Sequence, residues 1–299
     1  MTRDEGLARQ DEGLARQFEQ HRPRLRAVAY RMLGSLTEAD DAVQEAWLRA
    51  SAADSERVTN LAGWLTTIVS RVCLNQLRSR AHRREEPLEF HLPDPIVDEA
   101  SGTSPESEAL LSDAVGLAMF VVLDTLAPAE RVAFVLHDLF AVPFDDIAPI
   151  LGREPAATRQ LASRARRRVA EQAPPPDPDL AAQRAVVTAF QTAARGGDLT
   201  ALVALLDPDV VVRTDRGDLP SLVRRGPGEV ARGAIAFSTM AGAVRPVLVN
   251  GVAGALAYTD GRPSSLAAFT VVGGRVRAMD ILADPERLAA LGLPGPGEN

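Results

Sequence analysis

Apolar residues recur every three to four positions along most of the first 170 residues, which is the spacing of amphipathic helices. The clearest helical runs start at Phe18, Asn60, Leu110 and Pro128. Within 144–169 the pattern divides into two short helices, because Gly152 favours a left-handed stop and Pro155 suits the first turn of a new helix. The sequence therefore predicts a helix-turn-helix at this place.

The pattern changes after the proline-rich run at 174–179. Helical runs at 180–195 and 199–206 are followed by strand-like runs that start at Val210, Arg245, Ala255 and Ser265. Gly273 and Gly274 predict a tight hairpin, and Asp284 before Pro285 predicts the cap of a short last helix. Helices packed against a curved antiparallel sheet predict an α+β cone with an interior pocket.

A multidomain chain is therefore predicted, with two all-α helical modules followed by the α+β cone. A chain of 299 residues is long enough for several domains. The expected segments are a first helical module at 1–86, a linker at 87–109, a second helical module at 110–172, a proline-rich linker at 173–179 and the cone at 180–299. A duplicated DEGLARQ at 4–17 is expected to extend the first helix without changing its face, because each copy makes about two turns.

Composition restricts the chemistry and the partners of the chain. The net charge of −7 argues against indiscriminate binding to nucleic acid. The arginines are nevertheless clustered, with six against one acid in 153–168 and five without an acid in 71–84. One cysteine excludes a disulfide framework and a cysteine-based metal site. No metal and no cofactor are expected. No leader segment and no apolar run of about 20 residues is present, which favours a cytoplasmic protein without a membrane partner.

The second helix of the predicted helix-turn-helix carries the first candidate surface. Arginine, glutamine and threonine are the side chains that reach phosphates and base edges from a helix in the major groove. The positions expected to face outward here are Arg153, Thr158, Arg159, Gln160, Ser163, Arg164 and Arg167. A solvated basic helix without a partner is the alternative.

Two more helices present candidate surfaces. The first, with Thr37 as its expected cap, has an acidic face with one apolar point that suits a basic, partly apolar partner. That face comprises Asp40, Asp41, Gln44, Glu45 and Leu48. The second, with Asn60 as its expected cap, has a basic face that suits a DNA strand with an unstacked base. Its candidates are Trp64, Arg71, Asn75, Arg78 and Arg80, with a core position as the alternative for Trp64.

Taken together, these motifs resemble the extracytoplasmic-function (ECF) sigma factors of bacterial RNA polymerase, in the subgroup with a fused SnoaL-like C-terminal domain. The resemblance rests on ADDAVQEAWLRA, NLAGWLTTIVSRVCLNQLRSR, LAPAERVAFVLHDLF and FDDIAPILGREPAATRQLASRARRRV, and on VNGVAG, TDGRP and ADPERL near the end. It implies that the acidic face binds core RNA polymerase, that the basic helix at 60–84 contacts the promoter −10 element, and that the helix-turn-helix contacts the −35 element. Asn75 departs from the family, which commonly has aspartate there.

The resemblance also implies regulation in cis, in place of a separate anti-sigma protein. The subgroup's linker signature is matched by Leu92, Pro93, Asp94 and Pro95. The cone is expected to contact this signature through Asp215, Gly217, Asp284 and Pro285. The glycine-rich loop of the subgroup is represented here by residues 215–219, which read DRGDL.

Two alternatives to this function remain open. SnoaL-like cones often perform acid-base chemistry, so an isomerase or cyclase fused to a DNA-binding module would use Asp215, Asp260 or Asp280. A stand-alone helix-turn-helix regulator is the second alternative, although it would need neither the acidic face nor the basic helix at 60–84. A small-molecule ligand in the pocket of the cone is compatible with either function.

Overall fold

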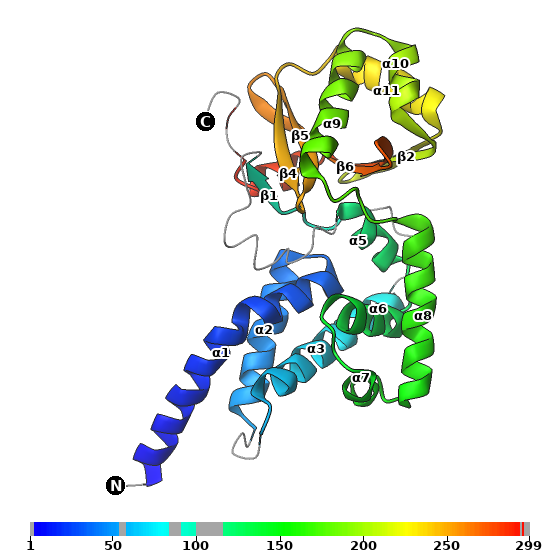
Figure 1. Cartoon of the computed structure of the whole chain (residues 1–299). Helices are drawn as coiled ribbons and strands as arrows, with labels where there is room; N and C mark the ends of the chain where they lie inside the picture. The colour runs from blue at the N-terminus through cyan, green and yellow to red at the C-terminus, as the bar shows by residue number, and fades with distance from the viewer. Residues whose placement is uncertain (1–2, 54–57, 84–90, 100–115, 294, 296–299) are drawn as a thin grey trace. The chain divides into compact units, whose positions relative to one another are not determined.

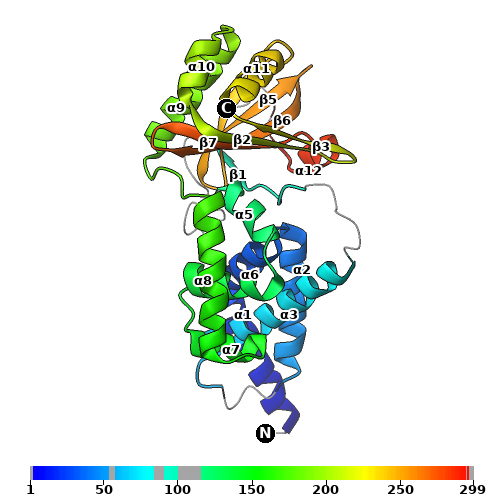
Figure 2. The ribbon, with the colours of Figure 1, turned by 90° about the vertical axis from the view of Figure 1, so that its right-hand side faces the viewer.

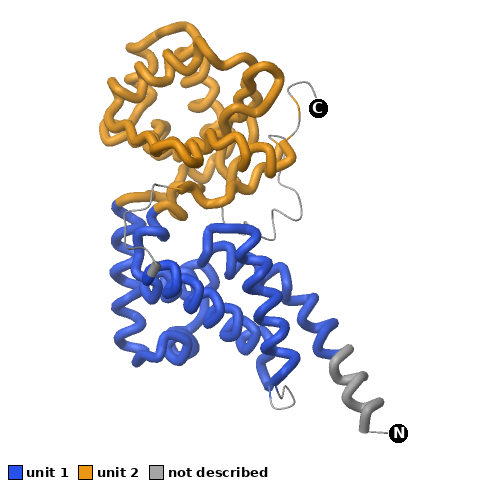
Figure 3. The backbone as a smooth tube through the Cα atoms, turned by 180° about the vertical axis from the view of Figure 1, so that it is seen from behind, with its two compact units in different colours: residues 1–87, 122–171 blue, residues 88–121, 172–299 orange. Residues whose placement is uncertain are grey.

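The computed structural model describes residues 3–53, 58–83, 91–99, 116–293 and 295 (Figure 1). Two compact units are present (Figure 3). The helical unit comprises residues 1–87 and 122–171, and the cone unit comprises residues 88–121 and 172–299. The cone unit therefore contains the described part of the predicted linker, residues 91–99, and residues 116–121 of the predicted second helical module, together with the cone itself.

The helical unit begins with a three-helix bundle. Its helices are α1 (Arg3–Leu33), α2 (Leu36–Ser51) and α3 (Leu61–Arg83). Phe18, Tyr30 and Leu65 are fully buried between them. As predicted, Asn60 caps α3 by accepting a hydrogen bond from the Gly63 amide at 3.0 Å. The prediction for Thr37 is wrong, because Ser35 holds the cap position of α2 and its hydroxyl accepts from the Glu38 amide.

The second half of the helical unit contains the predicted helix-turn-helix. Its elements are α6 (Pro128–Phe134), the π-helical turn η1 (Val135–Leu139), α7 (Phe144–Leu151) and α8 (Pro155–Gln172). Helix α5 (Leu117–Asp124) precedes them, and its residues 117–121 belong to the cone unit. Gly152 adopts a left-handed conformation with φ 64°, which ends α7 as the sequence predicts. Helix α3 packs against α6 and α7, so both helical modules share one unit.

The cone unit is an α+β structure, as predicted. Its helices are α9 (Leu180–Arg195), α10 (Leu199–Leu205), α11 (Pro227–Ser238) and α12 (Pro285–Ala290). Its strands are β1 (Val97–Glu99), β2 (Leu206–Arg216), β3 (Leu219–Arg225), β4 (Val244–Val249), β5 (Val252–Thr259), β6 (Arg262–Val272) and β7 (Arg275–Leu282). They form one sheet in the order β1-β4-β5-β6-β7-β2-β3, in which only β2 and β7 are parallel neighbours.

Each face of this sheet has its own core. Helices α9, α10 and α11 lie on one side of the sheet, and α12 lies on the other (Figure 2). Phe190 and Phe269 are buried on the first side, with ring centroids 5.7 Å apart. Leu92 of the predicted linker and Leu288 of α12 are buried on the second side. Because β1 pairs with β4, the linker extends the sheet and also covers this second face.

Two turns of the sheet illustrate how local chemistry sets strand limits. The predicted hairpin at Gly273 and Gly274 is confirmed, since both residues have positive φ between β6 and β7. The predicted start of a strand at Ala255 is wrong. Asn250 and Gly251 have φ of 50° and 77°, so the turn lies there and β5 starts at Val252.

Candidate functional site

The acidic face of α2 is exposed on the helical unit. Asp40, Asp41, Gln44 and Leu48 are exposed there, and Glu45 is partly buried. Asp40 accepts a hydrogen bond from Arg26 at 2.6 Å, and Glu45 pairs with Arg49. Asp41 and Gln44 make no side-chain hydrogen bond with the part of the chain that is described. The 61 % exposed side chain of Leu48 adds an apolar point to this acidic surface.

The basic face of α3 is smaller than predicted. Arg71, Asn75 and Arg78 are exposed, and Trp64 is partly buried. The Arg71 guanidinium donates to the Pro149 carbonyl of α7 at 3.5 Å. Arg80 departs from the prediction of an outward residue: its guanidinium donates to the Leu33 carbonyl at 3.1 Å and pairs with Glu38. The acid in the first turn of α2 therefore holds Arg80 against the bundle.

Helix α8 presents the predicted DNA-binding surface, with one correction. Its exposed members are Arg153 in the turn and Arg159, Gln160, Ser163, Arg164 and Arg167 on the helix. The prediction that Thr158 faces outward is wrong, because this residue is completely buried. Its hydroxyl donates to the Glu154 carbonyl one turn earlier, so the polar group is satisfied inside the protein.

The arginines of α8 differ in how far they are already engaged. The Arg159 guanidinium lies 5.3 Å from the ring centroid of Phe144. Arg166 donates to Asp138 at 2.7 Å, and this hydrogen bond raises the pKa of Arg166. Within the described residues, Gln160 and Arg167 make no side-chain hydrogen bond or ion pair. Both side chains are therefore available to a nucleic acid.

In the cone unit, a buried carboxylate holds the linker. The linker clasp is the set Leu92, Asp94, Asp215 and Arg287. Asp215 is completely buried, and its carboxylate accepts from the Leu92 amide and from the Arg287 guanidinium, each at 2.7 Å. Arg287 also donates to the Leu92 carbonyl at 2.7 Å and to Asp94 at 3.1 Å. Charge-assisted hydrogen bonds thus tie the linker to β2 and α12.

The other predicted regulatory residues surround the linker clasp. Gly217 donates from its amide to Asp215 at 3.1 Å, and Asp284 caps α12 by accepting from the Glu286 amide at 2.9 Å. Pro285 occupies the first turn of α12. Pro93 and Pro95 of the linker are buried.

Sequence reasoning did not select two residues that hold the linker. Arg287 forms most of the linker clasp. The side-chain carbonyl of Asn250 accepts from the Ile96 main-chain amide at 3.0 Å, and the Asn250 main-chain amide donates to the Ile96 carbonyl at 2.8 Å. Both residues lie inside motifs that carried the family resemblance, VNGVAG and ADPERL. That membership was the available signal for their role.

Replacing Gly217 with alanine is expected to destabilise the cone unit. Gly217 has φ 66°, and a Cβ atom at this position would lie 2.8 Å from the Asp284 carboxylate that caps α12. Gly261 is the matched control, because its φ is 76° and a Cβ atom there meets nothing within 4 Å. We expect Gly217→Ala to lower the free energy of unfolding by about 1 kcal/mol more than Gly261→Ala, the size of a helix-cap loss. Equal denaturant midpoints for the two variants would contradict this account.

The acids proposed for catalysis do not meet in the cavity of the cone. Asp215 faces the linker, and Asp260 is exposed in the turn between β5 and β6 with φ 50°. Asp280 is buried and accepts two hydrogen bonds from Arg213, at 2.6 and 3.2 Å. None of the three lines the cavity.

Within the described residues, no group of three or more histidine, cysteine or acidic side chains could hold a metal ion. Among the described helices, none has the length and apolar character needed to cross a membrane.

Family comparison assigns the two helical modules. A Sigma-70 region 2 model matches residues 17–83, which contain the acidic face of α2 and the basic face of α3. A Sigma-70 region 4 model matches residues 118–169, which contain the helix-turn-helix. The helical unit therefore has the two modules of a sigma factor.

Relatives that include the cone give the narrower assignment. The chain is 41% identical to the ECF RNA polymerase sigma factor SigJ of Mycobacterium tuberculosis, covering 90% of this chain and 91% of that protein. It is 34% identical to the probable ECF sigma factor SigI of the same species, covering 91% and 93% of the two chains. The crystal structure of M. tuberculosis SigJ superimposes with a TM-score of 0.74 over 92% of this chain and 98% of that one, at 37% identity. The chain belongs to the ECF RNA polymerase sigma factors.

Proposed function

We propose that this ECF sigma factor directs promoter-specific initiation by binding core RNA polymerase through α2 and promoter DNA through α3 and α8. The supporting observation is that one helical unit exposes an acidic face with an apolar point together with two arginine-bearing faces. Opposite charges on separate helices suit a protein that must bind a protein surface and a polyanion. A protein that acts with core polymerase on the chromosome works in the bacterial cytoplasm.

In this proposal each surface has a distinct task. Asp41, Gln44 and Leu48 contact polymerase, with Asp40 and Glu45 at the margin because each already pairs with an arginine. Arg71, Asn75 and Arg78 lie along the opened strand at the −10 element, where phosphate and base contacts are both needed. On α8, the arginines Arg153, Arg159, Arg164 and Arg167 contact phosphates at the −35 element, and Gln160 and Ser163 lie nearer the base edges.

The proposed regulation in cis acts through the linker clasp. The linker joins the two promoter-binding modules along the chain, and its residues 92–96 are hydrogen-bonded to the cone. Fixing this segment restricts the separations that the two modules can adopt. The cone thereby biases how the −10 and −35 modules engage a promoter, without a separate anti-sigma protein.

Reversing the charge of Asp41 is expected to abolish core binding and promoter-dependent transcription. Asp41 is exposed and unpaired within the described structure, so the substitution Asp41→Arg leaves no buried group behind. A charge reversal at a polar interface costs several kcal/mol, or about a hundredfold in affinity. The measurement is affinity of the full chain for core polymerase, followed by run-off transcription from a promoter library.

The matched control for this test is Glu229→Arg, an exposed acid on α11 of the cone unit. It changes the net charge by the same amount outside the proposed interface. Wild-type core affinity for Glu229→Arg and loss for Asp41→Arg support the proposal. Equal affinities for the two variants, or no promoter-dependent transcription by the unmodified chain, would contradict it.

A further inference from the structure

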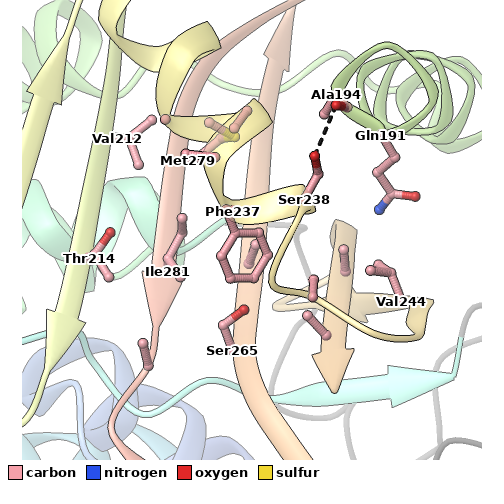
Figure 4. A pocket seen from close by; sticks show the side chains of 18 of the residues that line it. Gln191, Ala194, Val212, Thr214, Phe237, Ser238, Val244, Ser265, Met279 and Ile281 are labelled. Carbon is pink, nitrogen blue, oxygen red and sulfur yellow. Dashed lines mark hydrogen bonds between the residues drawn. The ribbon is translucent and has the colours of Figure 1, made fainter. Parts of the chain in front are cut away.

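The face of the sheet opposite the linker clasp borders a cavity of about 410 Å³. A volume of this size lies within the range of small-molecule binding sites. Figure 4 shows its surroundings: Gln191, Phe237 and Ser238 come from helices, and Thr214, Ser265 and Ile281 come from strands. The cavity is therefore enclosed by α9, α11 and the inner face of the sheet.

The cavity owes its volume to small side chains at positions that face the helices. Strand positions on a helix-covered face usually carry branched or aromatic side chains. Here Ala255 and Ala257 on β5 and Ala267 on β6 line the cavity instead, and Gly233 and Ala234 do so on α11. Phe190, Phe269 and Met279 are among the larger apolar side chains that line it. An apolar body is the occupant that such walls accept.

A serine hydroxyl gives this apolar cavity a polar point. Ser265 lines the cavity and is only 5 % exposed, yet its hydroxyl has no partner among the residues that the structure describes. Two other serines of the cavity are satisfied within the protein, since Ser264 donates to the Ala257 carbonyl and Ser238 to the Ala194 carbonyl. A cavity hydroxyl without a protein partner is free to form a hydrogen bond with a bound molecule. Ser265 is thus available to a bound molecule.

The charges along the cavity are all of one sign. Arg195, Arg216 and Arg224 line it, and no aspartate or glutamate does. Arg216 donates to the Pro220 carbonyl, whereas Arg195 and Arg224 have no carboxylate partner in the described structure. Gly233 leaves room for Arg224, because a Cβ atom at residue 233 would lie 3.1 Å from its Nη1 atom. Arginine forks match the geometry of a carboxylate.

We propose that the cavity binds a small molecule with an apolar body and a single carboxylate, of the size class of a medium-chain fatty acid. The apolar walls take the hydrocarbon, the arginines take the carboxylate, and the Ser265 hydroxyl bonds to a polar atom of the ligand. The site is distinct from the polymerase and DNA surfaces, so ligand binding can be tested independently of the proposed transcription function.

Occupancy of this cavity is also expected to affect the linker clasp. Thr214 and Arg216 line the cavity and flank Asp215 on β2, whose carboxylate points to the opposite face and holds Leu92. Ala283 also lines the cavity, donates its amide to the Asp215 carbonyl at 2.7 Å, and precedes the cap of α12. The two elements that hold the linker are therefore each continuous with the cavity wall. This coupling rests on the proposed role of the linker clasp, whereas ligand binding itself does not.

The test of the site compares decanoate, 1-decanol and decylamine by calorimetric titration of the full chain. Decanoate is expected to bind at least about tenfold more tightly than decanol, because decanol has the same apolar body without the charge. Decylamine is expected to bind more weakly still, because the arginines repel it. Equal affinity for decanoate and decanol, or no binding of decanoate, would overturn the proposal.

Neighbouring arginines on β3 provide a matched pair of variants. Arg224 lines the cavity and lies opposite Val212 in the pairing of β2 with β3. The next residue, Arg225, is exposed and lies opposite Val211. Arg224→Gln is expected to weaken decanoate binding about tenfold and Arg225→Gln to leave it unchanged. Ala267→Phe, which fills the cavity, is expected to abolish binding. Melting temperatures without ligand verify that each variant is folded. An equal loss of decanoate affinity in Arg224→Gln and Arg225→Gln would show that Arg224 does not bind the carboxylate of the ligand.

Hydrogen exchange tests the coupling without polymerase or promoter. The Leu92 and Ile96 amides report on the linker, since they donate to Asp215 and Asn250. Saturating decanoate is expected to change their exchange rates several-fold and to leave the amides of α2 unchanged. Unaltered exchange at Leu92 and Ile96 with the cavity saturated would overturn the coupling, and it would leave the proposed transcription function untouched.

Discussion

Replacing Arg287 with methionine is expected to lower the free energy of unfolding of the cone unit by about 3 kcal/mol. The side chain of Asp215 is 1 % exposed, so the substitution leaves a buried carboxylate without its counter-charge. Losing one partner of a buried pair costs about 3 to 5 kcal/mol, and the lower end applies because Arg287 is itself 25 % exposed. The substitution also removes the hydrogen bonds from Arg287 to Leu92 and Asp94, so the linker is expected to separate from the cone more often.

The appropriate control is Arg262→Met, which removes the same charge from an exposed position without a partner in the described structure. Chemical denaturation of the two full-length variants gives the stability difference, and hydrogen exchange at the Leu92 amide gives the state of the linker. With wild-type core affinity retained, promoter-dependent transcription by Arg287→Met is expected to differ several-fold from that of Arg262→Met. Equal unfolding midpoints and equal protection of Leu92 would show that the linker clasp holds nothing.

The parts of the fold that could be predicted are those with a strong local signal. Helix α9 has the predicted limits because its apolar positions repeat clearly and Asp179 caps it. Strand β3 and helix α11 were not predicted. The strand lies at the edge of the sheet and has no buried residue, so its alternation is weak, and α11 buries only Val230 and Ala231. β1 has three residues and exists only because β4 offers a partner.

The candidate sites show the same limit. Thr158 belongs to the inward series 158, 161, 165 and 169 by helical periodicity, but its polar side chain suggested an outward position. The structure resolves the conflict through its hydrogen bond to Glu154. Arg287 and Asp215 are 72 residues apart, so only the packing of β2 beside β7 and α12 brings them together. Local pattern identified the surfaces of single helices and could not identify a pair formed by tertiary structure.

Two substitutions on α8 are expected to weaken promoter binding in different ways. Arg167 is exposed and unpaired among the described residues, so in the proposed complex it contacts a phosphate. Arg167→Ala should therefore weaken binding equally for all −35 sequences. It should also reduce by about 1 the steepness with which the logarithm of the binding constant falls with the logarithm of the salt concentration. In the proposed complex, Gln160 lies nearer the base edges. Gln160→Ala should cost about 1 to 3 kcal/mol on the preferred sequence alone and relax selection at one base pair.

Arg166 provides the control on the same helix. It is adjacent to Arg167 and has the same charge, but its guanidinium is held by Asp138 at 2.7 Å. Arg166→Ala is therefore expected to change promoter affinity much less than Arg167→Ala. The measurement is binding of the holoenzyme to a promoter library with a randomised −35 element over a series of salt concentrations. If Gln160→Ala weakened all sequences equally, or if Arg166→Ala matched Arg167→Ala, net charge alone would explain the effect of α8. A base-selective loss in Gln160→Ala would instead require that this helix lies in the major groove of the −35 element.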